Sequence, residues 1–118
     1  MILVDTSIWI DHFNESDEEL VNLLNSGKVC IHPFIIGELS CGNISNRKEI
    51  LTLLKALPQV HSVLDEEVFT LIENKKLYGT GLGFIDVHLL ASALIDNVTI
   101  WTRDKTLKKA AINLHLHK

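Results

Sequence analysis

Hydrophobic residues form short blocks along the chain that suit alternating strands and helices. The first block, Ile2–Val4, is an apolar run typical of a short buried strand. Leucines then recur at helical spacing between a capping box that begins at Ser16 and a stop at Gly27. We therefore predict a strand that ends just before Asp5, and a helix over residues 17–26.

The same patterns predict the elements further along the chain. Short apolar runs indicate strands, and apolar residues three or four positions apart indicate helices. We expect a strand over 29–31, a short helix from Pro33 through Leu39, a helix that Asn46 and Glu49 cap and Pro58 closes, a strand over 60–64, and a helix capped by Asp65. A glycine-rich loop, a buried helix over 85–96, a strand over 98–101, a short helix with Lys105, Lys108 and Lys109, and an edge strand over 112–116 then follow.

Strands that alternate with helices favour an α/β fold with a central, mostly parallel sheet and helices on both faces. With 118 residues and no linker or repeat, we predict a single domain over residues 1–118. No apolar run approaches the roughly 18 residues of a membrane span, and the N-terminus does not have the pattern of a signal peptide. We therefore expect a cytoplasmic protein without membrane contact.

Acidic residues stand where parallel α/β sheets bind ligands, beyond the carboxyl ends of the strands. Asp5 ends the first strand, and Asp104 comes just after the strand over 98–101. Glu38, on the helix after the second strand, and Asp86, in the first turn of the buried helix, can reach the same edge. The sequence thus offers four carboxylates that can converge on one site.

Each of these acids also has a purely structural explanation. Asp5 and Asp104 are suited to cap the helices that follow them, and Asp86 to interact with the positive end of its own helix. Glu38 is harder to explain, because we expect it half-buried on an apolar helix face without a cation in reach. A hard divalent ion such as Mg²⁺ would supply that charge, since oxygen ligands without His or Cys suit it better than zinc.

Four short motifs contain these acids and extend over the whole chain. They are Val4-Asp5-Thr6-Ser7, Gly37-Glu38-Leu39, Phe84-Ile85-Asp86-Val87-His88-Leu89-Leu90-Ala91 and Trp101-Thr102-Arg103-Asp104. In order and position they resemble the four acidic motifs of PIN-domain nucleases, most closely those of the VapC-type toxins of toxin–antitoxin pairs. The resemblance implies a PIN-like fold and a metal-dependent endoribonuclease.

The resemblance also assigns roles to individual residues. It implies that Asp5, Glu38, Asp86 and Asp104 are catalytic and bind Mg²⁺ or Mn²⁺, and that Thr6 and Thr102 hold the carboxylates or water. Some relatives carry another acid just after the fourth motif, whereas Lys105-Thr106-Leu107 has none here, so the number of metal ions stays open. We expect RNA as the substrate, a VapB-type antitoxin as the partner, and a homodimer.

The net charge of −4 is unusual for a protein that binds nucleic acid, because basic surface usually meets the phosphates. If four of the fifteen acids are metal ligands, the remaining eleven match the eleven Lys and Arg residues. Arg103, Lys105, Lys108 and Lys109 stand beside Asp104 and are candidates to contact RNA phosphates. An ordinary solvated helix face explains these four residues nearly as well.

Two other functions compete with the nuclease. A phosphotransferase that uses Asp5 as a nucleophile usually needs a second acid two positions later, where this chain has Ser7. A PIN-like module that binds RNA or a partner without cutting is the other alternative. The presence of all four acids argues against it, so the sequence favours an endoribonuclease.

Overall fold

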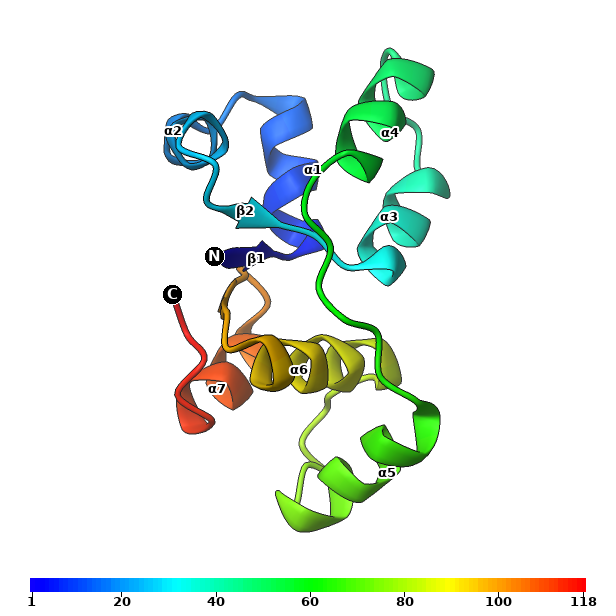
Figure 1. Cartoon of the computed structure of the whole chain (residues 1–118), viewed down its shortest axis with the longest axis vertical. Helices are drawn as coiled ribbons and strands as arrows, with labels where there is room; N and C mark the ends of the chain where they lie inside the picture. Colours follow the sequence, from blue (N-terminus) through cyan, green and yellow to red (C-terminus); the bar gives the residue numbers. More distant parts are fainter.

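Three short parallel strands form the centre of the protein in the computed structural model, which describes residues 1–118 (Figure 1). Strand β1 (Ile2–Val4) lies between β2 (Val29–Cys30) and β3 (Thr99–Trp101), so the order is β2-β1-β3. In register, Leu3 of β1 stands opposite Cys30 of β2 and Ile100 of β3. Because β1 is the central strand, the residue that follows it lies at the middle of the carboxyl edge of the sheet.

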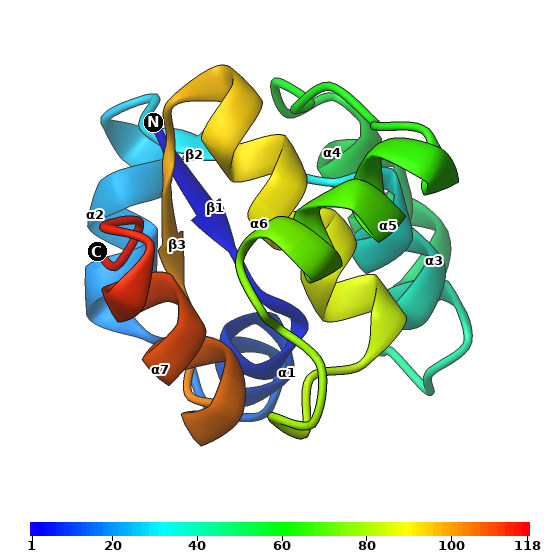
Figure 2. The same cartoon turned by 90° about the horizontal axis from the view of Figure 1, so that it is seen from below.

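Helices cover both faces of this sheet, as Figures 1 and 2 show. They are α1 (Thr6–Asn14), α2 (Glu18–Asn25), α3 (Pro33–Ser40), α4 (Arg47–Lys55), α5 (Asp65–Asn74), α6 (Phe84–Asp96) and α7 (Lys105–Asn113). In Figure 1, α1 and α2 lie on one side of the strands, and α6 and α7 lie on the other. The predicted α/β fold with a parallel sheet between helices is confirmed. No helix is both long enough and apolar enough to cross a membrane.

The hydrophobic core joins the sheet to the helices in a cluster of 27 buried residues. Helix α6 contributes most, since every residue from Val87 to Ala93 is buried. This agrees with its almost uniformly apolar sequence. The burial fixes the start of α6, and therefore Asp86, against the sheet.

Helix α1 is the element that the hydrophobic pattern misses. Only Ile8 and Trp9 of its nine residues are buried, while Ile10 next to them is exposed. Three consecutive apolar residues show neither the spacing of a helix nor the alternation of a strand, so local periodicity carries no signal here. The helix forms because its short apolar face packs against the core.

Two of the predicted strands are absent. Residues 60–64 form no strand, because the backbone N–H of His61 donates to the Asp96 carboxylate at 2.7 Å, and only Gln59 makes an isolated bridge to Ile31. The predicted strand over 112–116 is wrong as well, since α7 continues to Asn113 on buried Leu107, Ala110 and Ala111. After α7 a single bridge pairs His117 with Ile100.

Three predicted helix caps also differ. Asp17 caps α2 in place of Ser16, and its Oδ1 accepts the Leu20 N–H at 3.0 Å. Asn46 precedes α4, but its backbone is left-handed with φ of 53° and its side chain caps nothing. Asp65 is the first residue of α5, after the cap position, and its carboxylate contacts His88 at 3.1 Å. Tertiary contacts thus redirect side chains that local preference would place at caps.

Candidate active site

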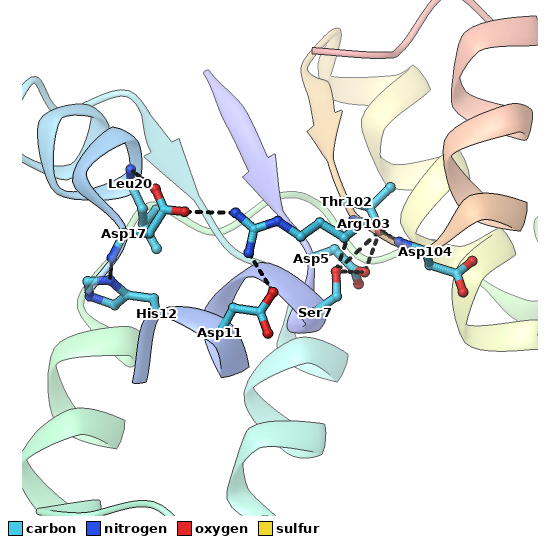
Figure 3. A network of polar contacts seen from close by, with 9 residues as sticks. All are labelled: Asp5, Ser7, Asp11, His12, Asp17, Leu20, Thr102, Arg103 and Asp104. Atoms are coloured by element: carbon cyan, nitrogen blue, oxygen red, sulfur yellow. Dashed lines mark hydrogen bonds and ion pairs between the residues drawn. The ribbon is translucent and has the colours of Figure 1, made fainter. Parts of the chain in front are cut away.

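The carboxyl ends of β1 and β3 bring two sequence-distant acidic motifs together (Figure 3). The parallel ladder continues past β1, because the Asp5 N–H donates to the Trp101 carbonyl at 2.9 Å. This bond places Asp5 beside Thr102, which is one residue after the end of β3. Figure 3 shows Asp5, Ser7, Thr102 and Asp104 in one group at this edge.

Asp5 is a buried carboxylate with an exposed fraction of only 8%. One oxygen, Oδ2, accepts hydrogen bonds from the Thr102 hydroxyl at 2.7 Å and the Ser7 hydroxyl at 3.0 Å. Its other oxygen, Oδ1, accepts no hydrogen bond from the protein. A buried charge without a cation beside it is costly, so the free oxygen is suited to bind a positive ion.

Thr102 connects Asp5 to Asp104. The Thr102 hydroxyl donates to Asp5 and accepts the backbone N–H of Asp104 at 3.0 Å. The Asp104 carboxylate in turn caps α7, because its Oδ2 accepts the Leu107 N–H at 2.8 Å. Capping therefore accounts for one carboxylate oxygen of Asp104. The other oxygen, Oδ1, accepts no hydrogen bond from the protein and lies at the same edge of the sheet.

Asp86 lies half-buried in the first turn of α6, where its Oδ2 accepts the Gly83 N–H at 3.1 Å. Burial raises the pKa of the Asp86 carboxyl, and the negative charges of Asp5 and Asp104 raise this pKa further. The hydrogen bond from the Gly83 N–H lowers the pKa and so offsets part of the rise. Asp86 is thus within electrostatic range of Asp5 and Asp104, whose negative charges repel its own.

Glu38 approaches this group from α3, but it is exposed and not half-buried as expected. The prediction that Glu38 is a half-buried carboxylate is wrong. Because its side chain is exposed to water, burial gives no reason to expect a cation beside it. The position of the side chain is set by Thr6, the residue after Asp5, whose hydroxyl donates to Glu38 Oε1 at 2.9 Å. Glu38 consequently lies at the solvent side of the acidic edge.

The donor set fits a hard divalent cation. Each of the four acids has one oxygen without a hydrogen bond from the protein: Asp5 Oδ1, Glu38 Oε2, Asp86 Oδ1 and Asp104 Oδ1. Only carboxylates contribute, which suits Mg²⁺ or Mn²⁺ and not zinc. As the side chains lie, no group of three or more Asp, Glu, His or Cys residues is arranged to hold a metal ion. Cation binding therefore requires the carboxylates to approach one another.

Ser7 is a site residue to which the sequence motifs assign no specific role. Its hydroxyl donates to Asp5 and accepts the backbone N–H of Arg103 at 3.1 Å. The only sequence signal is its place in the motif Val4-Asp5-Thr6-Ser7, two residues after the carboxylate that it contacts. Ser7 thereby links the first acidic motif to the fourth.

The predicted RNA-contacting cations take different positions. The Arg103 guanidinium turns away from Asp104 toward α1 and α2, where it pairs with Asp11 at 2.5 Å and Asp17 at 2.7 Å (Figure 3). Lys105, Lys108 and Lys109 are exposed on α7 and form no ion pair. The lysines are thus free to meet an anion, whereas Arg103 is already engaged.

The chain is similar to known proteins in both sequence and fold. The family model described as "PIN domain" matches residues 2–113. The chain is 46% identical over 111 residues to Ribonuclease VapC32 of two Mycobacterium tuberculosis strains, which covers 93% of this chain and 90% of the relative. The crystal structure of PAE2754 from Pyrobaculum aerophilum is similar in fold, with a TM-score of 0.64 and 15% identity over 97% of this chain and 94% of that one. The chain therefore belongs to the PIN-domain family, among its VapC-type members.

Proposed function

We propose that the protein is a metal-dependent endoribonuclease, the toxin of a VapBC-type toxin–antitoxin pair. The observation that carries this proposal is the buried Asp5 carboxylate. Two hydroxyls donate to one of its oxygens, and the acids Asp86 and Asp104 lie within electrostatic range. The relative VapC32 is named a ribonuclease, which supports RNA as the substrate. Such an activity would operate in the cytoplasm.

The proposed mechanism is hydrolysis of a phosphodiester by water. Asp5, Asp86 and Asp104 would hold Mg²⁺ or Mn²⁺, with Glu38 completing the set from the solvent side. The bound ion supplies Lewis acidity toward water and toward the phosphate oxygens. Ser7 and Thr102 fix Asp5, and Thr6 orients Glu38, so these hydroxyls keep the carboxylates in place.

The test is RNA cleavage by the purified protein with Mg²⁺, Mn²⁺ or Zn²⁺ and with EDTA. Mg²⁺ and Mn²⁺ should support cleavage, Zn²⁺ should replace them poorly, and EDTA should abolish the activity. Asp5→Asn should lose most of the activity, whereas the control Glu66→Gln, an exposed acid on α5, should keep it. Full cleavage in EDTA would exclude the metal mechanism. RNA binding without cleavage under any condition would favour the non-cutting PIN-like module.

A VapB-type antitoxin is the partner that we infer. An apolar groove of about 190 Å³ lies between α1, α2 and α4, with Trp9, Phe13 and the exposed Leu53 among its lining residues. It suits the apolar face of an amphipathic helix. A second hollow shares Phe13 with this groove and includes Glu38. An antitoxin segment that follows both can place an Arg or Lys among the four acids and exclude the metal.

A homodimer is the assembly that we propose. Phe34, Phe69 and Phe84 are at least 40% exposed, although Phe69 and Phe84 stack with ring centroids 5.6 Å apart. They form an aromatic patch on α3, α5 and α6, and exposed apolar patches mark protein contacts. Light scattering should give a dimer mass for the wild type and a smaller mass for Phe69→Ser. A monomeric wild type would exclude this assembly.

A further inference from the structure

A basic cleft of about 570 Å³ lies between α7 and the segment that joins α5 to α6. Lys75 and Lys76 line it from the end of α5, and Lys105 and Lys109 line it from α7. In Figure 2 the α5–α6 segment and the first turn of α7 both lie beyond the tip of β1. No acidic residue lines the cleft, although the whole chain has a net charge of −4.

The four lysines have no counterions within the protein. Only two of the eleven Lys and Arg residues, Arg103 and Lys118, form ion pairs with carboxylates. Four ammonium groups around one cleft repel one another, which does not stabilise the fold. A purely structural role, in which each lysine neutralises an acid, is therefore absent, and the arrangement favours an anionic ligand.

Lys76 adds an independent observation, because it occupies a backbone position suited to glycine. Its φ is 51°, and α5 ends around it in a Schellman pattern, with the Leu77 N–H bound to the Ile72 carbonyl at 3.0 Å. The same segment uses glycine at its two other left-handed positions, Gly79 and Gly81. Glycine would fit this position without strain, so the lysine is present at some cost to the stability of the fold.

The cleft opens directly beside the acidic edge. Lys105 and Thr106 follow Asp104, and on the other wall Leu82 precedes Gly83, whose N–H binds Asp86. The two walls approach closely there, since a Cβ added to Gly81 would lie 3.6 Å from the Thr106 methyl group. No acidic residue lies in sequence between the lining residue Leu82 and Asp86, or between Asp104 and Lys105, so a strand in the cleft would reach the four carboxylates without passing another acid.

The other side of the acidic edge has the opposite character. A hollow of about 420 Å³ beside Arg103 is lined by Asp11, Glu15 and Asp17. The single guanidinium there already pairs with two of these acids. A phosphate chain is thus attracted to the lysine side and repelled on the Arg103 side, which gives the site one preferred direction of approach.

We propose that the lysine cleft binds the sugar–phosphate backbone of the RNA strand on one side of the cleaved bond. Lys75, Lys76, Lys105 and Lys109 would contact its phosphates, which positions the strand without reading its sequence. The inference rests on the proposed nuclease function, because it assigns a substrate subsite to that active site. An acidic protein segment is disfavoured, since the apolar lining is confined to Leu77, Leu82 and Ala110.

Binding of a short fluorescein-labelled oligouridylate, followed by fluorescence anisotropy in a Glu38→Gln background, tests this subsite. Each lysine that meets a phosphate of a single strand steepens the dependence of log K on log salt by about 0.7. Lys105→Ala and Lys109→Ala should each flatten this slope by about that amount, which corresponds to about fivefold weaker binding at about 0.1 M salt. The control Lys48→Ala, an exposed lysine on α4, should change neither.

Two further variants separate the cleft from general charge and from folding. Lys108 lies on α7 but does not line the cleft, so Lys108→Ala should weaken binding less than Lys109→Ala. Lys76→Gly should weaken binding about fivefold while raising the urea midpoint of unfolding, because glycine relieves the left-handed backbone. A merely damaged fold cannot produce higher stability together with weaker binding.

Unchanged binding and unchanged salt slope in Lys76→Gly, Lys105→Ala and Lys109→Ala would overturn the subsite, even if the wild type cleaves RNA. A loss of affinity in these variants for a polyglutamate peptide, and not for the RNA, would overturn it as well. If they weaken RNA binding as expected but the wild type never cleaves with Mg²⁺ or Mn²⁺, the subsite is supported and the nuclease function fails.

Discussion

Acidification should destabilise the protein through His32, the buried residue that begins the helix carrying Glu38. The His32 side chain has no exposed surface, and its Nδ1 caps α3 by accepting the Phe34 N–H at 2.9 Å. Its Nε2 has no hydrogen-bond partner. Burial lowers the pKa of His32 to about 4, with a further contribution from the neighbouring His88. The folded protein therefore holds this imidazole neutral.

The size of the effect follows from proton linkage. The unfolded chain protonates His32 with a pKa near 6.5, whereas the folded chain does so only near 4. The stabilisation is thus fully present above about pH 6.5 and is lost as the pH falls toward 4. Between about pH 7.5 and about pH 5, these two values correspond to a loss of about 2 kcal/mol. Protonation of Nδ1 would also remove the acceptor that caps α3.

Urea unfolding followed by tryptophan fluorescence at the two pH values measures this loss. His32→Asn removes the imidazole but keeps a side-chain acceptor at the cap position. The wild type should lose about 2 kcal/mol more than His32→Asn on acidification, even though the variant starts less stable because of lost volume. His115→Asn, which replaces an exposed imidazole, is the matched control and should follow the wild type. Equal losses in wild type and His32→Asn would mean that His32 is not the group that titrates.

The site yields three further predictions. Replacing any one of the four clustered acids by its amide should keep the fold, as circular dichroism will report, and remove most RNA cleavage; an amide variant that cuts normally does not belong to the site. Thr102→Val should cost about 1–3 kcal/mol of unfolding free energy and reduce cleavage, because it leaves the Asp104 N–H without its acceptor and the buried Asp5 with only the Ser7 hydroxyl, whereas Thr102→Ser should restore both. An antitoxin whose inserted Arg or Lys is changed to Ala should still bind but no longer inhibit; full inhibition would mean that steric cover of the site, and not charge, blocks the nuclease.

Local sequence is sufficient for the elements whose signals are carried by neighbouring residues. The apolar runs at β1 and β3 and the uniformly apolar sequence of α6 predict that these elements are buried, because the spacing of apolar side chains indicates which face of an element packs against the core. The rule that parallel strands bind ligands at their carboxyl ends then places Asp5 and Asp104 at one edge from the sequence alone. The four acidic motifs add Glu38 and Asp86 to the candidate site.

Side chains without a local signal find their partners only through tertiary packing. Arg103 stands beside Asp104 in sequence, yet it pairs with Asp11 and Asp17 about ninety residues away. Lys75 and Lys105 are thirty residues apart and line one cleft only because tertiary packing brings the end of α5 beside the start of α7. Periodicity records whether a residue is buried, whereas charge pairing and cleft formation depend on which distant segments the packed core brings together.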